Sequence, residues 1–153
     1  MTSTLRSHYR RLRGELGNPR TEDLGVLTQR DIDRFAVASH APVTGTQAPP
    51  LFLSSVMGWG AGPPEGELDT DGTAVADTRG LRLTGVRLMG AGQNLEFHAP
   101  VEAGTRVLAH TSLRDVEIKY GQSGPLLVLC LERQFTDDTG RPLVTCQETF
   151  IAR

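Results

Sequence analysis

Two pairs of residues in this 153-residue chain have the types and spacing for acid–base chemistry. Asp33 precedes His40 by seven positions, and Glu96 precedes His98 by two. A carboxylate beside an imidazole can move a proton near neutral pH, because histidine titrates there. Each pair also has a structural interpretation. His40 can cap the end of a helix, and Glu96 with His98 can face solvent or a neighbouring chain.

The apolar segment 48–60 follows the first pair and is expected to position it. Pro50 suits the first turn of a helix, and only Ser54 and Ser55 interrupt the large apolar residues before the glycines at 58 and 60. About ten helical residues span roughly 15 Å, which is too short to cross a bilayer. A helix without a polar face is normally buried. We therefore predict a buried helix here.

Helices are predicted before this segment and strands after it. Residues 4–16 and 28–38 have helical spacing, Thr28 and Asp31 form a capping pattern, and 62–78 form a polar loop that we interpret as a surface loop or lid. Strand patterns cover 81–89, 93–99, 105–120, 125–136 and 143–152, with a hairpin turn at 121–124. The last strand faces inward either through Val144, Cys146 and Phe150 or through the alternate residues, and we favour the first set. These elements predict an α+β fold, a curved antiparallel sheet around one helix.

Composition excludes several classes of protein. The net charge of -2 provides no drive toward nucleic acid or membrane, and no stretch is apolar enough to span a bilayer. The segment 4–16 has four arginines without an aromatic platform, so we expect a solvated helix or a partner contact there. Cys130 and Cys146 lack metal-ligand spacing and are expected to be free thiols. Without an apolar leader, a cytoplasmic protein is expected. The run 126–131 is too apolar for the sheet of a free monomer, so we expect at least a dimer.

Four segments together resemble one family. They are Ala-Pro-Pro-Leu-Phe at 48–52, the strand and turn at 89–105, the hairpin Tyr-Gly-Gln-Ser-Gly-Pro-Leu at 120–126, and the closing strand at 148–153. In this order they resemble MaoC-like hot-dog hydratases and dehydratases of the N-terminal, FAS1-like type. The likeness is nearest to N-terminal halves of mesaconyl- and methylfumaryl-CoA hydratases. It predicts a helical extension at 1–20 and a single hot-dog domain at 21–153.

The resemblance implies hydration or dehydration of a 2-enoyl or 3-hydroxyacyl thioester on CoA or an acyl carrier protein. It implies no metal and no cofactor. The substrate's arm is expected beside the central helix at a subunit interface, where backbone N–H groups hold the thioester carbonyl. The substrate-binding candidates are Pro49, Pro50, Leu51, Phe52, Gly90, Gly92, Gln93 and Asn94.

The family's catalytic signature is missing from the sequence. The active half of such proteins has an Asp five positions before a His, but no histidine here follows an Asp at that spacing. Ala99 and Thr105 also stand where the family motif has Arg and Asp. Three interpretations stay open. The chain is a non-catalytic, substrate-binding subunit whose partner brings the Asp/His pair; an enzyme using Asp33 with His40 or Glu96 with His98; or a binding module or thioesterase-like variant. The expected assembly is a homodimer or a heterodimer with a second hot-dog subunit.

Overall fold

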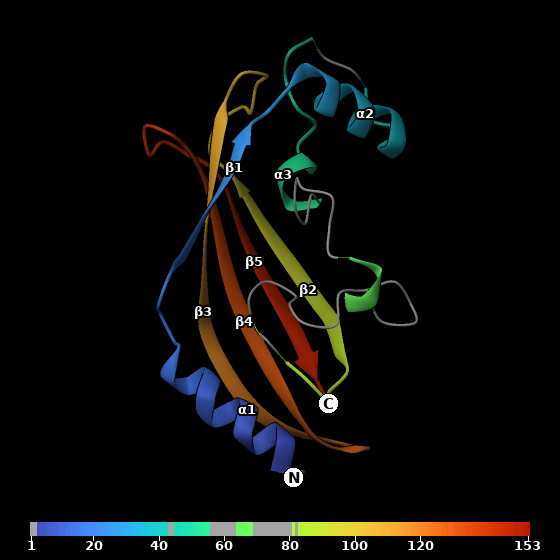
Figure 1. Cartoon of the computed structure of the whole chain (residues 1–153), viewed down its shortest axis with the longest axis vertical. Helices are drawn as coiled ribbons and strands as arrows, with labels where there is room; N and C mark the ends of the chain where they lie inside the picture. Colours follow the sequence, from blue (N-terminus) through green and yellow to red (C-terminus); the bar gives the residue numbers. More distant parts are fainter. Residues whose placement is uncertain (1–2, 43–44, 56–63, 69–80, 82) are drawn as a thin grey trace.

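A computed structural model describes residues 3–42, 45–55, 64–68, 81 and 83–153. A long curved sheet carries α2 and α3 at one end and α1 at the other (Figure 1). In chain order, the elements are α1 (Ser3–Gly14), β1 (Arg20–Val26), α2 (Gln29–Ser39), α3 (Phe52–Ser55), the 3₁₀ helix η1 (Glu65–Glu67), β2 (Leu88–Phe97), β3 (Arg106–Gly121), β4 (Gly124–Asp137) and β5 (Pro142–Ala152). None of the described helices is long and apolar enough to cross a membrane.

The five strands form one antiparallel sheet in the order β1-β3-β4-β5-β2. The prediction of a strand at 105–120 is confirmed as a single strand, which bends at a bulge between Leu113 and Asp115. The hairpin at 121–124 is also confirmed, since Gly121 pairs with Gly124. β2 and β1 lie at the two edges of the sheet.

The strand predicted at 81–89 is wrong except at its end, because β2 begins only at Leu88. Leu81 is instead buried against α1, and Leu83 packs on the same cluster. Carbonyl groups of the segment accept hydrogen bonds from α1: Thr84 O from His8 Nε2 (2.8 Å) and Leu81 O from Arg11 (2.6 Å). These carbonyl groups therefore accept hydrogen bonds from side chains of α1 and not from the backbone of a neighbouring strand in the described sheet.

α1 is not the solvated helix that the sequence suggested. Leu5 and Leu12 are buried in an apolar cluster with Leu127, Leu129 and Leu131 of β4. These positions share one face of β4 with Phe135, which belongs to the cluster around α3. We call this the inner face of the sheet. Val144 and Cys146 are buried in the α3 cluster and Phe150 packs on the α1 cluster, which confirms the predicted orientation of β5.

α3 covers part of the inner face, although its start differs from the prediction. The first helical residue is Phe52, because the segment from Pro49 makes a turn in which Phe52 N–H donates to Pro49 O (2.9 Å). Phe52 and Leu53 are buried in the core. The rest of the predicted helix, from residue 56, lies outside the described residues. The predicted loop at 62–78 lies mostly outside them too, and its described part contains η1.

α2 is held at both ends by specific contacts. The predicted cap is confirmed: Thr28 Oγ1 accepts from Asp31 N–H (3.2 Å), and Asp31 Oδ2 accepts from Thr28 N–H (3.2 Å). Phe35 packs edge-to-face on Phe52, with ring centroids 5.1 Å apart, and this contact joins α2 to α3. Cys130, which is half-buried, and Cys146, which is buried, are both thiols in the structure.

His40 ends α2 in the left-handed conformation, with φ 54° and ψ 26°. The N–H groups of His40 and Ala41 donate to Val37 O (3.3 Å) and Ala36 O (3.0 Å). Glycine normally occupies this position, because a Cβ is strained there. We expect His40→Gly to raise the free energy of unfolding by about 0.5–1 kcal/mol in urea titration. The matched variant Ala38→Gly, inside the helix, should lower it by a similar amount. Equal effects of the two variants would contradict this interpretation.

Three carboxylates of the described residues have a pKa below its usual range. The pKa of Asp23 is lowered by its hydrogen bond with Arg106, that of Glu132 by Arg114, and that of Asp137 chiefly by Thr139. Each depressed pKa contributes stability that is present above the unfolded pKa of about 4 and lost as pH falls through the folded pKa.

We therefore expect the thermal midpoint to fall as the pH is lowered from about 5 to about 3. Replacing Glu132 with Gln should lower the midpoint at pH 6 and make its acid dependence shallower, because the variant cannot take up that proton. Calorimetry from pH 3 to 6 measures both effects. An unchanged slope in the variant would show that this carboxylate does not contribute.

Candidate functional site

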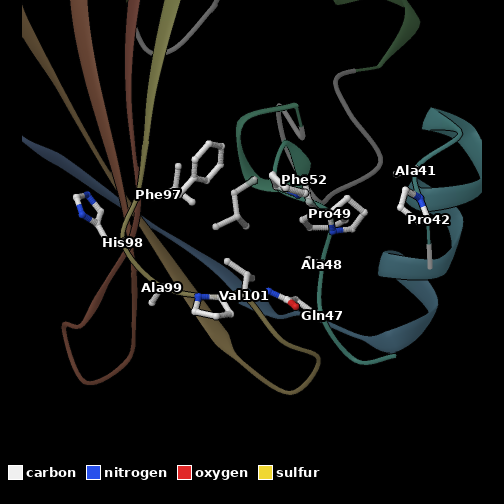
Figure 2. A pocket seen from close by; sticks show the side chains of 14 residues that line it. Ala41, Pro42, Gln47, Ala48, Pro49, Phe52, Phe97, His98, Ala99 and Val101 are labelled. Atoms are coloured by element: carbon white, nitrogen blue, oxygen red, sulfur yellow. The ribbon is translucent and has the colours of Figure 1, made fainter. Parts of the chain in front are cut away.

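A pocket of about 570 Å³ opens between the end of α2, the turn before α3 and the end of β2 (Figure 2). Its volume is in the range of small-molecule sites, about 300–1,000 Å³. The described lining residues are Ala41, Pro42, Gln47, Ala48, Pro49, Pro50, Phe52, Leu53, Phe97, His98, Ala99, Pro100, Val101 and Val144.

Backbone hydrogen bonds fix the walls of this pocket. Ala48 N–H donates to Val101 O (2.7 Å), and Ala103 N–H donates to Thr46 O (2.9 Å), so the turn before α3 runs beside the segment after β2. On the other side, the N–H groups of His98 and Ala99 donate to Leu143 O (2.9 and 3.3 Å). These bonds join segments about 50 residues apart in the sequence.

The pocket is predominantly apolar. Phe97 is the last residue of β2, and its ring lies on the cavity side of the strand, whereas the ring of His98 points to the opposite side (Figure 2). Phe97 is 51% exposed, and Leu51, in the turn before α3, is 52% exposed. Half-exposed apolar side chains at a pocket are typical of sites that bind an apolar ligand or a partner.

All four histidines lie in the described residues, and the rings of three of them have a hydrogen-bond partner outside the cavity. His8 Nε2 donates to Thr84 O. His110 Nδ1 lies 2.9 Å from Thr21 Oγ1 on the outer face of the sheet. His98 Nε2 lies 2.9 Å from Thr145 Oγ1. His40 is the exposed cap of α2.

The structure brings together only one of the two candidate acid–base pairs. No hydrogen bond or ion pair among the described residues joins Asp33 to His40; Asp33 Oδ1 accepts from Gln29 Nε2 (2.8 Å) instead. Glu96 Oε1 lies 3.9 Å from His98 Nδ1, so this pair is brought together. It lies on the outer face, where His98 already contacts Thr145. Within the described residues, no group of three His, Cys, Asp or Glu could hold a metal ion.

The substrate-binding candidates are divided between two places. Pro49, Pro50 and Phe52 line the pocket, and Leu51 lies among them in the sequence. The other four candidates lie farther back along β2 and are not among the lining residues. Gly90 and Gly92 flank a bulge, Gln93 Nε2 donates to Cys146 Sγ (3.1 Å), and Asn94 pairs with Gln147.

Ten of the fourteen described lining residues were not predicted as site residues: Ala41, Pro42, Gln47, Ala48, Leu53, Phe97, Val144 and the segment 99–101. The segment 99–101 could have been identified from the resemblance of residues 97–100 to a family motif. Nothing comparable marks Ala41 or Gln47, whose positions depend on the pairing of the turn before α3 with Val101 and Ala103.

Known structures with this architecture identify the class as the hot-dog fold. The ChsH1-ChsH2 complex from Mycobacterium tuberculosis matches with a TM-score of 0.65 at 13% identity, covering 97% of this chain and 90% of that chain. The HadBC 3R-hydroxyacyl-ACP dehydratase complex from the same organism gives 0.58 at 15% identity, covering 87% and 95%. The R-hydratase PhaJ1 from Pseudomonas aeruginosa gives 0.59 at 15% identity, covering 94% and 84%.

The family follows from the sequence match. Residues 35–146 match the FAS1-like, dehydratase domain region. This match covers most of the chain, which therefore belongs to that family. Curated protein sequences yield no significant match. The predicted hot-dog fold and the predicted MaoC-like, FAS1-like family are both confirmed.

Proposed function

We propose that this chain is the substrate-binding subunit of an (R)-specific-type enoyl-thioester hydratase or 3-hydroxyacyl-thioester dehydratase. The acyl group is carried on CoA or an acyl carrier protein, and a second hot-dog subunit provides the acid–base pair. The observation that carries this proposal is the position of the histidines. All four are described: His8, His40 and His110 are not among the described lining residues, and the ring of His98, which is among them, points away from the cavity (Figure 2).

The pocket supports binding of an acyl thioester. Its apolar lining gains free energy by removing an acyl chain or pantetheine arm from water, at about 25 cal/mol per Å² of apolar surface. The fixed turn from Ala48 to Phe52 provides a rigid wall against which a bound thioester is oriented. In the proposed complex this chain binds, orients and desolvates the substrate, and proton transfer belongs to the partner.

The edge position of β2 in the described sheet supports a partner beside the pocket. Among the described strands β2 pairs only with β5, so no described strand bonds to the backbone N–H and C=O groups of its other edge. The same strand ends at Phe97 in the pocket wall. A second subunit that pairs with this edge therefore stands next to the bound thioester. Two of the similar structures, ChsH1-ChsH2 and HadBC, are complexes of two named components.

The alternative with its own catalytic site depends on Glu96 and His98, whose side chains are 3.9 Å apart. Hydration of crotonyl-CoA, followed through the enoyl-thioester absorbance, separates the two proposals. We expect the isolated chain to bind the thioester, detected as a thermal shift, without hydrating it. Hydration that is lost in His98→Ala or in His40→Ala would overturn the subunit proposal. Release of free CoA would instead indicate a thioesterase.

A further inference from the structure

The described pocket lining contains no inward charged side chain. Of the fourteen lining residues, only His98 can carry charge, and its ring points away from the cavity (Figure 2). Gln47 contributes the one other polar side chain of this lining, which is neutral. The remaining twelve are alanine, proline, valine, leucine and phenylalanine.

Ala99 occupies a position from which a longer side chain would change this chemistry. Its backbone is fixed by the bond from its N–H to Leu143 O (3.3 Å), and its half-buried methyl group packs on the core cluster around α3. It is one of the described residues that line the pocket, as are Phe97 and Val101. A cationic side chain at this position would place a charge at the cavity.

We infer that this pocket selects uncharged acyl groups, and that Ala99 is a specificity-determining residue for that choice. The inference rests on the proposed function, since it takes the acyl thioester as the ligand. A carboxylate moved from water into an apolar cavity loses hydration, and the described lining offers it no cation. An aliphatic acyl group of the same size gains from the same apolar surface.

Two CoA esters of similar length test the inference: hexanoyl-CoA, which ends in a methyl group, and glutaryl-CoA, which ends in a carboxylate. Titration calorimetry with CoA alone gives the baseline. We expect the wild-type chain to bind hexanoyl-CoA about 100-fold more tightly than glutaryl-CoA. Ala99→Arg should reduce this ratio at least about tenfold, because the guanidinium pairs with the carboxylate. Ala99→Leu, which fills space without charge, should keep the preference for hexanoyl-CoA.

A second variant keeps the inference testable if Ala99→Arg does not fold. Gln47 is exposed and lines the same pocket, so Gln47→Arg adds a cation without entering the core, and it should also reduce the ratio. Equal affinity for the two esters in the wild-type chain would overturn the inference, as would an unchanged ratio in both arginine variants. If neither ester binds more tightly than CoA, the proposed function itself fails, which is a distinguishable result.

Discussion

Replacing Phe135 with alanine is expected to lower the free energy of unfolding by about 3–5 kcal/mol. Phe135 is fully buried at the centre of the α3 cluster, between Ala109 of β3 and Val144 of β5. The guanidinium of Arg133, itself buried, lies 5.0 Å from the ring centroid. Truncation therefore leaves a cavity and removes a cation–π contact. Urea unfolding followed by circular dichroism measures the loss.

Phe97→Ala is the matched control for this prediction. Phe97 is 51% exposed at the end of an edge strand, so the same truncation should cost less than about 1 kcal/mol. Because its ring lines the pocket, the variant should instead weaken binding of acyl-CoA. Phe135 thus has its main effect on stability and Phe97 on binding. Similar losses of stability in the two variants would contradict the assignment of the core to the inner face.

Side-chain periodicity predicted β5 because one face of this strand is buried and the other is not. In β5, the alternation through Val144 and Cys146 gave both the strand and its inner face, and the structure agrees. β1 was missed because six of its seven residues are not buried and only Leu24 enters the core. In β1 apolar residues do not alternate with polar ones, so the sequence pattern does not mark it as a strand. The ion pair of Asp23 with Arg106 joins this edge strand to β3.

The candidate site was only partly predictable because it is assembled from distant segments. The segment at Pro49 and Pro50 was identifiable from composition and family likeness, although it was predicted as the start of the helix and is a turn in the structure. The opposite wall depends on the register of β2 with β5, which pairs Phe97 with Val144. That register also moves Gln93 into contact with Cys146, away from the pocket lining. The sequence shows that apolar and polar residues alternate along β2, but it does not show how far each residue lies from α3.

A second hot-dog subunit that carries an Asp/His pair, encoded beside this chain, is expected to raise the rate of crotonyl-CoA hydration at least about 1,000-fold over the isolated chain. General acid–base catalysis alone contributes about 10²–10⁴-fold, and a shared site also orients the substrate. The measurement is the decay of enoyl-thioester absorbance for each subunit alone and for the purified complex. A complex that forms without any gain in rate would refute the assignment of the chemistry to the partner.

Variants of the complex separate the contributions of the two subunits. Replacing the partner's histidine with alanine should lower kcat about 10²–10⁴-fold. Phe97→Ala in this chain should raise KM with a smaller effect on kcat, since its ring contributes binding surface rather than a proton. His40→Ala and His98→Ala should leave both constants unchanged, because His40 is not a described lining residue and the ring of His98 points away from the cavity (Figure 2). A fall in kcat with His98→Ala would instead move the acid–base role to the Glu96–His98 pair, the one candidate pair that the described structure brings within 4 Å.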